Sequence, residues 1–122
     1  MKIVRIDPGK REPATGALFV GTAARQAVIG EGDSGQLRIG VVTFQDGAVN
    51  KFHRHTFDQV LVVTEGEGIV QVNGEPERRI TAGDIIFVPA GEVHWHGAAP
   101  GRTMSHVTVA TPGTTEMVGD GP

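Results

Sequence analysis

The chain has 122 residues, of which 39% are hydrophobic and 20% are charged, with a formal net charge of -3 and no cysteine. This length fits one domain, and the slightly negative charge offers no basic surface for phosphate backbones, so we expect no nucleic-acid partner. Without cysteine, disulfides, thiolate nucleophiles and zinc–thiolate sites are excluded, and any metal must have nitrogen and oxygen ligands. The N-terminus lacks the apolar core of a signal peptide, and no apolar run approaches a membrane span. We therefore expect a cytoplasmic protein with no membrane partner.

Short apolar runs between turn residues predict an all-β barrel or sandwich. The chain contains 18 glycines and 7 prolines, and the runs between them are rich in Val, Ile, Thr and Phe, as is typical of short strands. Residues 2–6 alternate weakly and predict an edge strand or a swapped arm. Residues 17–21 predict a short strand, and residues 22–29 predict either a strand or a helical turn. Residues 36–45 predict a clearer strand, with Arg38 inside the barrel or at its mouth.

The second half of the chain predicts six more strands around the hairpin signal Asn73-Gly74. They are expected at residues 59–64, 68–73, 77–80, 85–88, 93–98 and 103–110. Of these, 77–80 is expected to be exposed and 85–88 to be buried. From Thr111 onward the sequence is small, polar and rich in turn residues. We therefore assign residues 1–110 to the barrel and 111–122 to a flexible C-terminal tail.

The chain contains two His-x-His pairs: His53 with His55 lies in a further β-type pattern within residues 47–66, and His94 with His96 lies in the predicted strand 93–98. Successive side chains of a strand point to opposite faces, so the two members of each pair face the same way. Gln59 begins the next strand and can direct its amide oxygen to the same point. Imidazoles suit Mn, Fe, Ni, Zn and Cu better than Ca or Mg. The pattern predicts a divalent transition metal bound by His53, His55, Gln59 and His94.

The remaining histidines have two interpretations each. His96 either joins the metal ligands or lines the pocket as a proton-transfer group, and His106 either lines the pocket or fills the core. We take both as candidate acid–base residues. Gln59 has an alternative role as a hydrogen-bonding neighbour of the ligands or as a turn cap. Trp95 is expected to face away from His94, into a separate core or a subunit interface.

These residues resemble the two sequence motifs of the cupin family. The first motif is matched by Gly47, His53, His55, position 59 and Gly66, and the second by Gly83, Pro89, Gly91 and His94. Gln59 replaces the usual glutamate of the first motif, and Ala98 replaces the final asparagine of the second. The wider pattern is similar to small single-domain cupins of the carboxymuconolactone decarboxylase-like group.

The resemblance implies a single-domain cupin barrel, which is a double-stranded β-helix or jelly roll, with a metal near its mouth and commonly a homodimer. It implies no particular substrate, because cupins carry out many reactions. We expect an enzyme whose metal, held by three histidines and a glutamine, polarises a carbonyl-bearing or aromatic small molecule in an isomerase-, decarboxylase- or cyclase-type reaction. The alternatives are a metal-dependent dioxygenase, a non-catalytic sensor or small-molecule-binding barrel, and a barrel in which the histidines only stabilise the fold.

Overall fold

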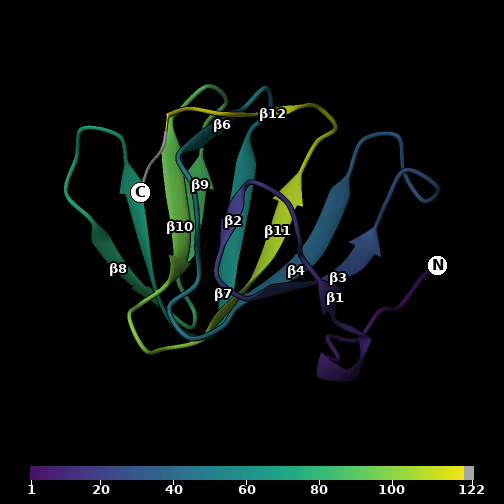
Figure 1. The fold of residues 1–122 in the computed structure, drawn as a ribbon. Coiled ribbons are helices and arrows are strands. Elements are labelled where there is room, and N and C mark those ends of the chain that lie inside the picture. Colours follow the sequence, from purple (N-terminus) through teal and green to yellow (C-terminus); the bar gives the residue numbers. More distant parts are fainter. Residues whose placement is uncertain (120–122) are drawn as a thin grey trace.

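The computed structural model describes residues 1–119, and its regular structure consists of strands and one short 3-10 turn (Figure 1). The strands are β1 (Glu12–Pro13), β2 (Phe19–Val20), β3 (Ala23–Ile29), β4 (Arg38–Phe44), β5 (Val49–Asn50), β6 (His53–His55), β7 (Gln59–Val72), β8 (Arg78–Thr81), β9 (Ile85–Val88), β10 (His94–Ala98), β11 (Met104–Ala110) and β12 (Thr115–Met117), and the turn is η1 (Pro8–Lys10). The all-β prediction is confirmed. No helix in the described part of the chain is long and apolar enough to span a membrane.

The long strand β7 joins the two sheets of the barrel because it belongs to both. Its first half pairs with β11 and β9, in a sheet ordered β1-β3-β4-β11-β7-β9. Its second half pairs with β8 and β10, and β10 continues to β5 and β2 at one end and to β6 and β12 at the other. Gly66 lies where β7 crosses between the sheets, with a φ of 79°. A Cβ at this position would collide with the carbonyl oxygen of Thr103, so the crossing requires glycine.

The inner faces of the two sheets form the main core. Its buried members are Ala23, Phe44, Ala48, Val63, Val70, Ile80, Ala98 and Met104. Trp95 lies in a separate cluster with Ile69 and Ala99, and its indole N–H donates to Gln71 Oε1 at 2.7 Å. Trp95 therefore faces away from His94 and His96, as the strand alternation predicts.

Residues 2–6 do not form an edge strand of this chain, although their alternation predicts one. Residues 1–7 have no regular structure, and the buried amide of Gln26 holds them in place. Gln26 Nε2 donates to the Arg5 carbonyl oxygen, and Gln26 Oε1 accepts from the Asp7 N–H, each at 2.9 Å. The alternation of residues 2–6 was too weak to compete with these side-chain bonds. Residues 23–29, by contrast, form the strand and not the helical turn.

The strand at residues 85–88 was expected to be buried, and this is wrong for two of its residues. Ile85 is 70% exposed and Phe87 is 61% exposed. The strand, β9, pairs only with β7 and lies at the edge of its sheet. Its outward side chains therefore have no layer above them within one chain.

The tail also differs from the expectation, because residues 115–117 form strand β12 against β6. Thr115 pairs with His55 and Met117 with His53, and Arg54 donates two hydrogen bonds to Glu116 Oε2 at 2.9 and 3.0 Å. A composition of small polar residues predicts a loop, but the cross-strand side-chain contacts of Thr115 and Glu116 with β6 accompany the strand pairing here. The part of the predicted tail at residues 120–122 lies outside the described residues.

Candidate metal centre

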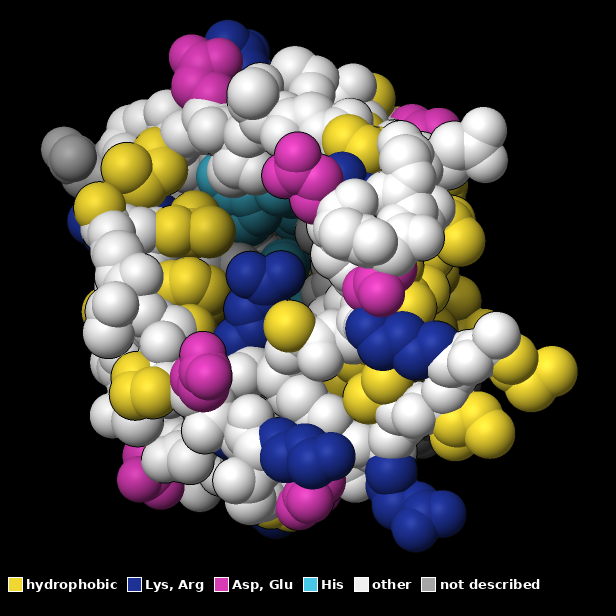
Figure 2. Space-filling view, turned by 90° about the vertical axis from the view of Figure 1, so that its right-hand side faces the viewer, with side chains coloured by type: hydrophobic (Ala, Val, Ile, Leu, Met, Phe, Trp, Pro, Cys, Tyr) yellow, Lys and Arg dark blue, Asp and Glu magenta, His cyan; other side chains and the backbone are white. Residues whose placement is uncertain are grey.

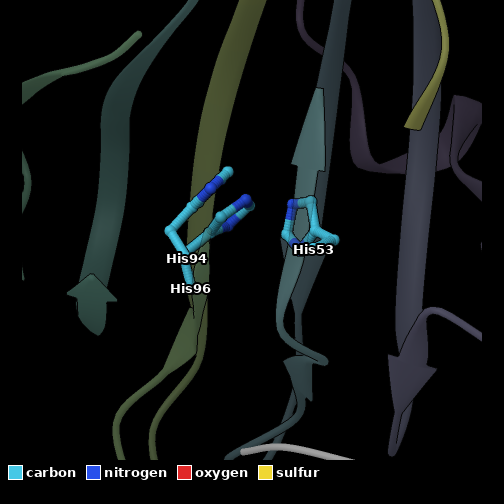
Figure 3. Close-up of side chains that lie close together, drawn as sticks. All are labelled: His53, His94 and His96. Carbon is cyan, nitrogen blue, oxygen red and sulfur yellow. The ribbon is translucent and has the colours of Figure 1, made fainter. Parts of the chain in front are cut away.

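Strands β6, β10 and β11 bring all five histidines of the chain into one buried region. His53 and His94 are direct cross-strand partners, and their ring centroids are 4.3 Å apart. Figure 3 shows His53 facing His94 and His96 across the space between β6 and β10. The ligand atoms of these three residues all lie within 4.8 Å of one another, which is close enough to hold one metal ion. His55 lies beside this group, with its ring centroid 4.8 Å from that of His53.

Backbone carbonyls orient two of the imidazoles. The Nδ1–H of His53 donates to the Lys51 carbonyl oxygen at 2.6 Å, and the Nδ1–H of His94 donates to that of Glu92 at 2.9 Å. A carbonyl oxygen can only accept, so in each neutral ring the proton is on Nδ1 and the lone pair is on Nε2. Such support of the second ring nitrogen is typical of metal-binding histidines.

His55 and Gln59 add buried polar atoms that have no hydrogen-bond partner. His55 Nδ1 lies 2.8 Å from the hydroxyl of Thr115 on β12, and when this hydroxyl accepts the hydrogen bond, the lone pair of the ring is on Nε2. The buried atoms His55 Nε2, His94 Nε2 and Gln59 Oε1 have no hydrogen-bond partner among the described residues. A buried polar atom without a partner costs roughly 1–3 kcal/mol, so such a cluster is typical of a site that binds an electrophile. A transition-metal ion fits these nitrogen and oxygen donors.

His96 has a different hydrogen-bonding pattern. Its backbone N–H donates to Asn50 Oδ1 at 2.9 Å, which fixes the amide so that Asn50 Nδ2 faces His96 Nε2 at 3.2 Å. The amide nitrogen can only donate, so Nε2 is the acceptor and Nδ1 carries the proton. Proximity groups His96 with His53 and His94, but its buried and unpaired Nδ1 is a donor. When the Thr115 hydroxyl accepts from His55 Nδ1–H, His55 has a free lone pair on Nε2, whereas that of His96 is occupied by Asn50.

His106 lies next to His96, with the ring centroids 4.9 Å apart. Its Nδ1 is 3.1 Å from the Thr108 hydroxyl, and its Nε2 is buried without a partner. Both residues line the same pocket. Of the two interpretations of His106, the pocket-lining position is the one observed.

Burial keeps these imidazoles neutral. Desolvation lowers the pKa of His53 to about 3 and that of His55 to about 4, with a further contribution from the charge of His94. Desolvation also lowers the pKa of His94 and His96, and it lowers the pKa of His106 to about 4. At neutral pH the ring lone pairs are therefore not blocked by protons, as metal binding requires.

A pocket of about 810 Å³ opens beside the histidines. Figure 2 shows it as a hollow with cyan histidine side chains inside. Its inner end is lined by His53, His55, Gln59, His96 and His106, its walls include Phe19, Phe44 and Phe57, and its outer part includes Glu12, Arg25 and Arg38. Phe57 stacks on His55 with a centroid distance of 4.7 Å. The size suits a small organic molecule with an aromatic or aliphatic part.

The sequence of residues 40–110 matches the family model of the cupin domain, and this range includes all the histidines and Gln59. The chain belongs to the cupin family. The comparisons do not resolve groups within the family, so the carboxymuconolactone decarboxylase-like grouping stays a prediction.

Two curated relatives of this cupin are enzymes. This chain is 33% identical over 109 residues to an (R)-mandelonitrile lyase of Granulicella tundricola, and the match covers 89% of this chain and 83% of the relative. It is 35% identical over 80 residues to an acireductone dioxygenase of a Sulfurihydrogenibium species, covering 60% of this chain and 45% of that relative. Among solved structures, a cupin-like protein of Thermotoga maritima matches with a TM-score of 0.86 and 31% identity, over 94% of this chain and 90% of that one.

Proposed function

We propose that this cupin is a metal-dependent lyase for a carbonyl-forming or aromatic small molecule, with the ion held by His53, His55, Gln59 and His94. The observation that carries the proposal is the cluster of buried polar atoms without partners, His55 Nε2, His94 Nε2 and Gln59 Oε1. All four ligands are neutral, so a divalent ion bound there retains its charge and supplies Lewis acidity to a substrate oxygen.

Two pocket histidines have complementary roles in proton transfer. His96 presents Nδ1–H as a donor because Asn50 occupies its Nε2. His106 is neutral at pH 7, and when the Thr108 hydroxyl accepts from its Nδ1–H, its Nε2 is free to take a proton. A donor and an acceptor thus face one pocket, which suits general acid–base catalysis.

The similarity to a protein named (R)-mandelonitrile lyase supports a lyase reaction at a carbon that carries a hydroxyl group. For such a substrate, His106 Nε2 removes the hydroxyl proton while the neighbouring carbon–carbon bond breaks. The hydroxyl oxygen becomes a carbonyl oxygen, and the leaving group takes the bond's electron pair and then the proton. The Nδ1–H of His96 donates to a substrate oxygen during this step. Phe19, Phe44 and Phe57 line the pocket and limit the access of water.

The second candidate is a metal-dependent dioxygenase, which the similarity to acireductone dioxygenase favours. The two functions differ in redox chemistry. Consumption of oxygen during turnover would support the dioxygenase, whereas conversion of substrate without oxygen uptake would support the lyase.

The test is metal analysis of protein purified without added metal, together with cleavage of mandelonitrile followed by the absorbance of benzaldehyde. We expect His53→Ala to lose most of the bound metal and Gln59→Ala to lose part of it, because an amide is the weaker ligand. The control is His106→Ala, which should keep the metal and lose activity. Wild-type metal content in the His53 variant would contradict the proposed ligand set.

A further inference from the structure

Arg25 lines the same pocket as the histidines, from strand β3 of the first sheet. It pairs with Val42 of β4, and Val42 pairs in turn with His106 of β11. Side chains of directly opposed residues share one face of a sheet, so Arg25 and His106 both face inward. The two backbones are two strand spacings apart, roughly 10 Å. Both side chains line the pocket, and Figure 2 shows a dark blue Lys or Arg side chain in the hollow beside the histidines.

The guanidinium of Arg25 has no anionic partner among residues 1–119. None of the four ion pairs in this part of the chain includes it. Glu12 is its cross-strand neighbour and also lines the pocket, yet the two side chains do not form an ion pair. Arg38, the other pocket arginine, instead uses Nη1 to bind the carbonyl oxygens of Ser34 and Leu37 at 2.6 and 2.8 Å. Arg25 thus keeps all of its guanidinium donors available among the described residues, whereas Arg38 already uses Nη1.

A glycine on the next strand allows the guanidinium to lie over the sheet. A Cβ added to Gly40 of β4 would be 3.4 Å from Arg25 Nε and 3.6 Å from Nη2. The charged end of Arg25 therefore extends over β4 toward β11 and does not stand straight out into water. One strand spacing, roughly 5 Å, then separates it from the strand that carries His106.

We propose that Arg25 forms an anion subsite, and that the substrate is a small molecule with a carboxylate at the end opposite its reacting oxygen. This rests on the proposed function, which places the reacting oxygen at the histidine end of the pocket. A guanidinium presents paired N–H donors that match the two oxygens of a carboxylate. The distance between the Arg25 guanidinium and the histidine end of the pocket suits a substrate with one aromatic ring or a short chain. The phenylalanines that line the pocket favour the aromatic ring.

The experiment compares two probes that differ only in charge, 4-formylbenzoate and 4-formylbenzamide. Each has an aldehyde oxygen at one end, and the acid alone has an anion at the other. Calorimetric titration at low and high sodium chloride gives the dissociation constants for the wild type, Arg25→Gln and Arg79→Gln. Arg79 is exposed on β8 in the second sheet, so its variant makes the same charge change outside the pocket. Metal content and thermal stability are measured on the same samples.

We expect the wild type to bind the acid about tenfold more tightly than the amide at low salt, as for one charge-assisted contact. The preference should decrease at high salt because Arg25 is exposed. Arg25→Gln should lose the preference with unchanged metal content, Arg25→Lys should keep part of it, and Arg79→Gln should keep all of it.

The proposal is overturned if the wild type shows no preference for the acid, or if Arg25→Gln and the wild type show the same preference. Equal losses in Arg25→Gln and Arg79→Gln would also overturn it, because they indicate a general effect of charge. A preference that survives in Arg25→Gln but is lost in His53→Ala would assign the carboxylate to the metal. Absence of metal from the wild type would count against the proposed function alone, since the effect of Arg25 on the two probes is measured separately.

Discussion

At the scale of single residues, neighbouring groups give chemically identical imidazoles different roles. The carbonyls of Lys51 and Glu92 leave Nε2 of His53 and His94 as acceptors. Asn50 has the opposite effect on His96, because it leaves Nδ1–H as the free group. Ligand or donor character is therefore decided by hydrogen bonds and not by the presence of a histidine alone.

The pKa of His106 predicts how stability depends on pH. Burial lowers this pKa from 6.5 to about 4 in the folded chain. Between these values the unfolded chain binds more protons, so the free energy of unfolding rises with pH. The contribution of neutral His106 to the free energy of unfolding is fully present above pH 6.5 and is lost as the pH falls toward 4. We expect His106→Gln to reduce the pH dependence by up to ~1.4 kcal/mol per pH unit in this window.

The measurement is urea unfolding across this pH window, in the presence of a chelator so that metal release does not contribute. The other buried histidines remain in both proteins, so a smaller dependence should persist in the variant. Identical pH dependence of the free energy of unfolding in the wild type and His106→Gln would show that His106 does not titrate in this way.

The sequence shows the proposed ligands but not the groups that orient them. The spacing of His53, His55 and His94 is visible because strand alternation places them on one face. Asn50 is 46 residues from His96, and Thr115 is 60 residues from His55. Their contacts depend on pairing between distant strands, and an asparagine or a threonine alone is no signal for it. The carbonyl partners lie two residues before their histidines, and this short offset could have been suspected.

At the scale of elements, β12 connects the C-terminal segment to the candidate metal centre. It pairs with β6, and its Thr115 hydroxyl contacts His55 Nδ1. We expect Thr115→Val to weaken metal binding by about tenfold to a hundredfold, because the imidazole loses the partner that orients it. Competition with a metal-binding dye measures the change.

Thr115→Ser is the matched variant for this test, since it keeps the hydroxyl and should bind metal nearly as the wild type does. Glu116→Gln weakens the exposed pair with Arg54 and tests the strand pairing alone. If valine and serine at position 115 gave equal affinities, the hydroxyl would have no orienting role.

The predictable strands are those with strong apolar patterns between clear turns. Residues 38–44 and 104–110 form β4 and β11 close to their expected ranges. The short strands β1 and β12 were missed, because two or three residues carry no periodicity. Exposure at β9 was misjudged because an uninterrupted apolar run does not show which of its faces is covered.

At the scale of the whole molecule, the outer face of the first sheet is apolar. Ile85 and Phe87 of β9 are exposed there, beside the half-buried Val60 and Val62 of β7. The adjacent strand β11 continues the face with valines at 107 and 109. A contiguous apolar face of this kind is typical of an interaction surface. Because the resemblance to cupins implies a homodimer, we expect a second copy of the chain to cover this face.

Light scattering coupled to size-exclusion chromatography tests this prediction. The wild type should have the mass of a dimer, and Phe87→Glu should shift it toward the monomer, because a carboxylate would be buried without a partner. Val20 is also exposed, on β2 of the other sheet, so Val20→Glu is the control and should leave the mass unchanged. A monomeric wild type would exclude the homodimer.

The shared strand β7 determines where the chain tolerates changes in length. Gln59 lies at its start, and the residues that pair with His94 and His96 lie near its end. Adding or removing one residue within residues 60–71 would turn the side chains of one half of the strand to the opposite face of its sheet. The polar loops at residues 30–37 and 73–77 tolerate changes in length, since they only connect β3 to β4 and β7 to β8. Natural variation in length among close relatives should therefore accumulate at these loops and be absent from β7.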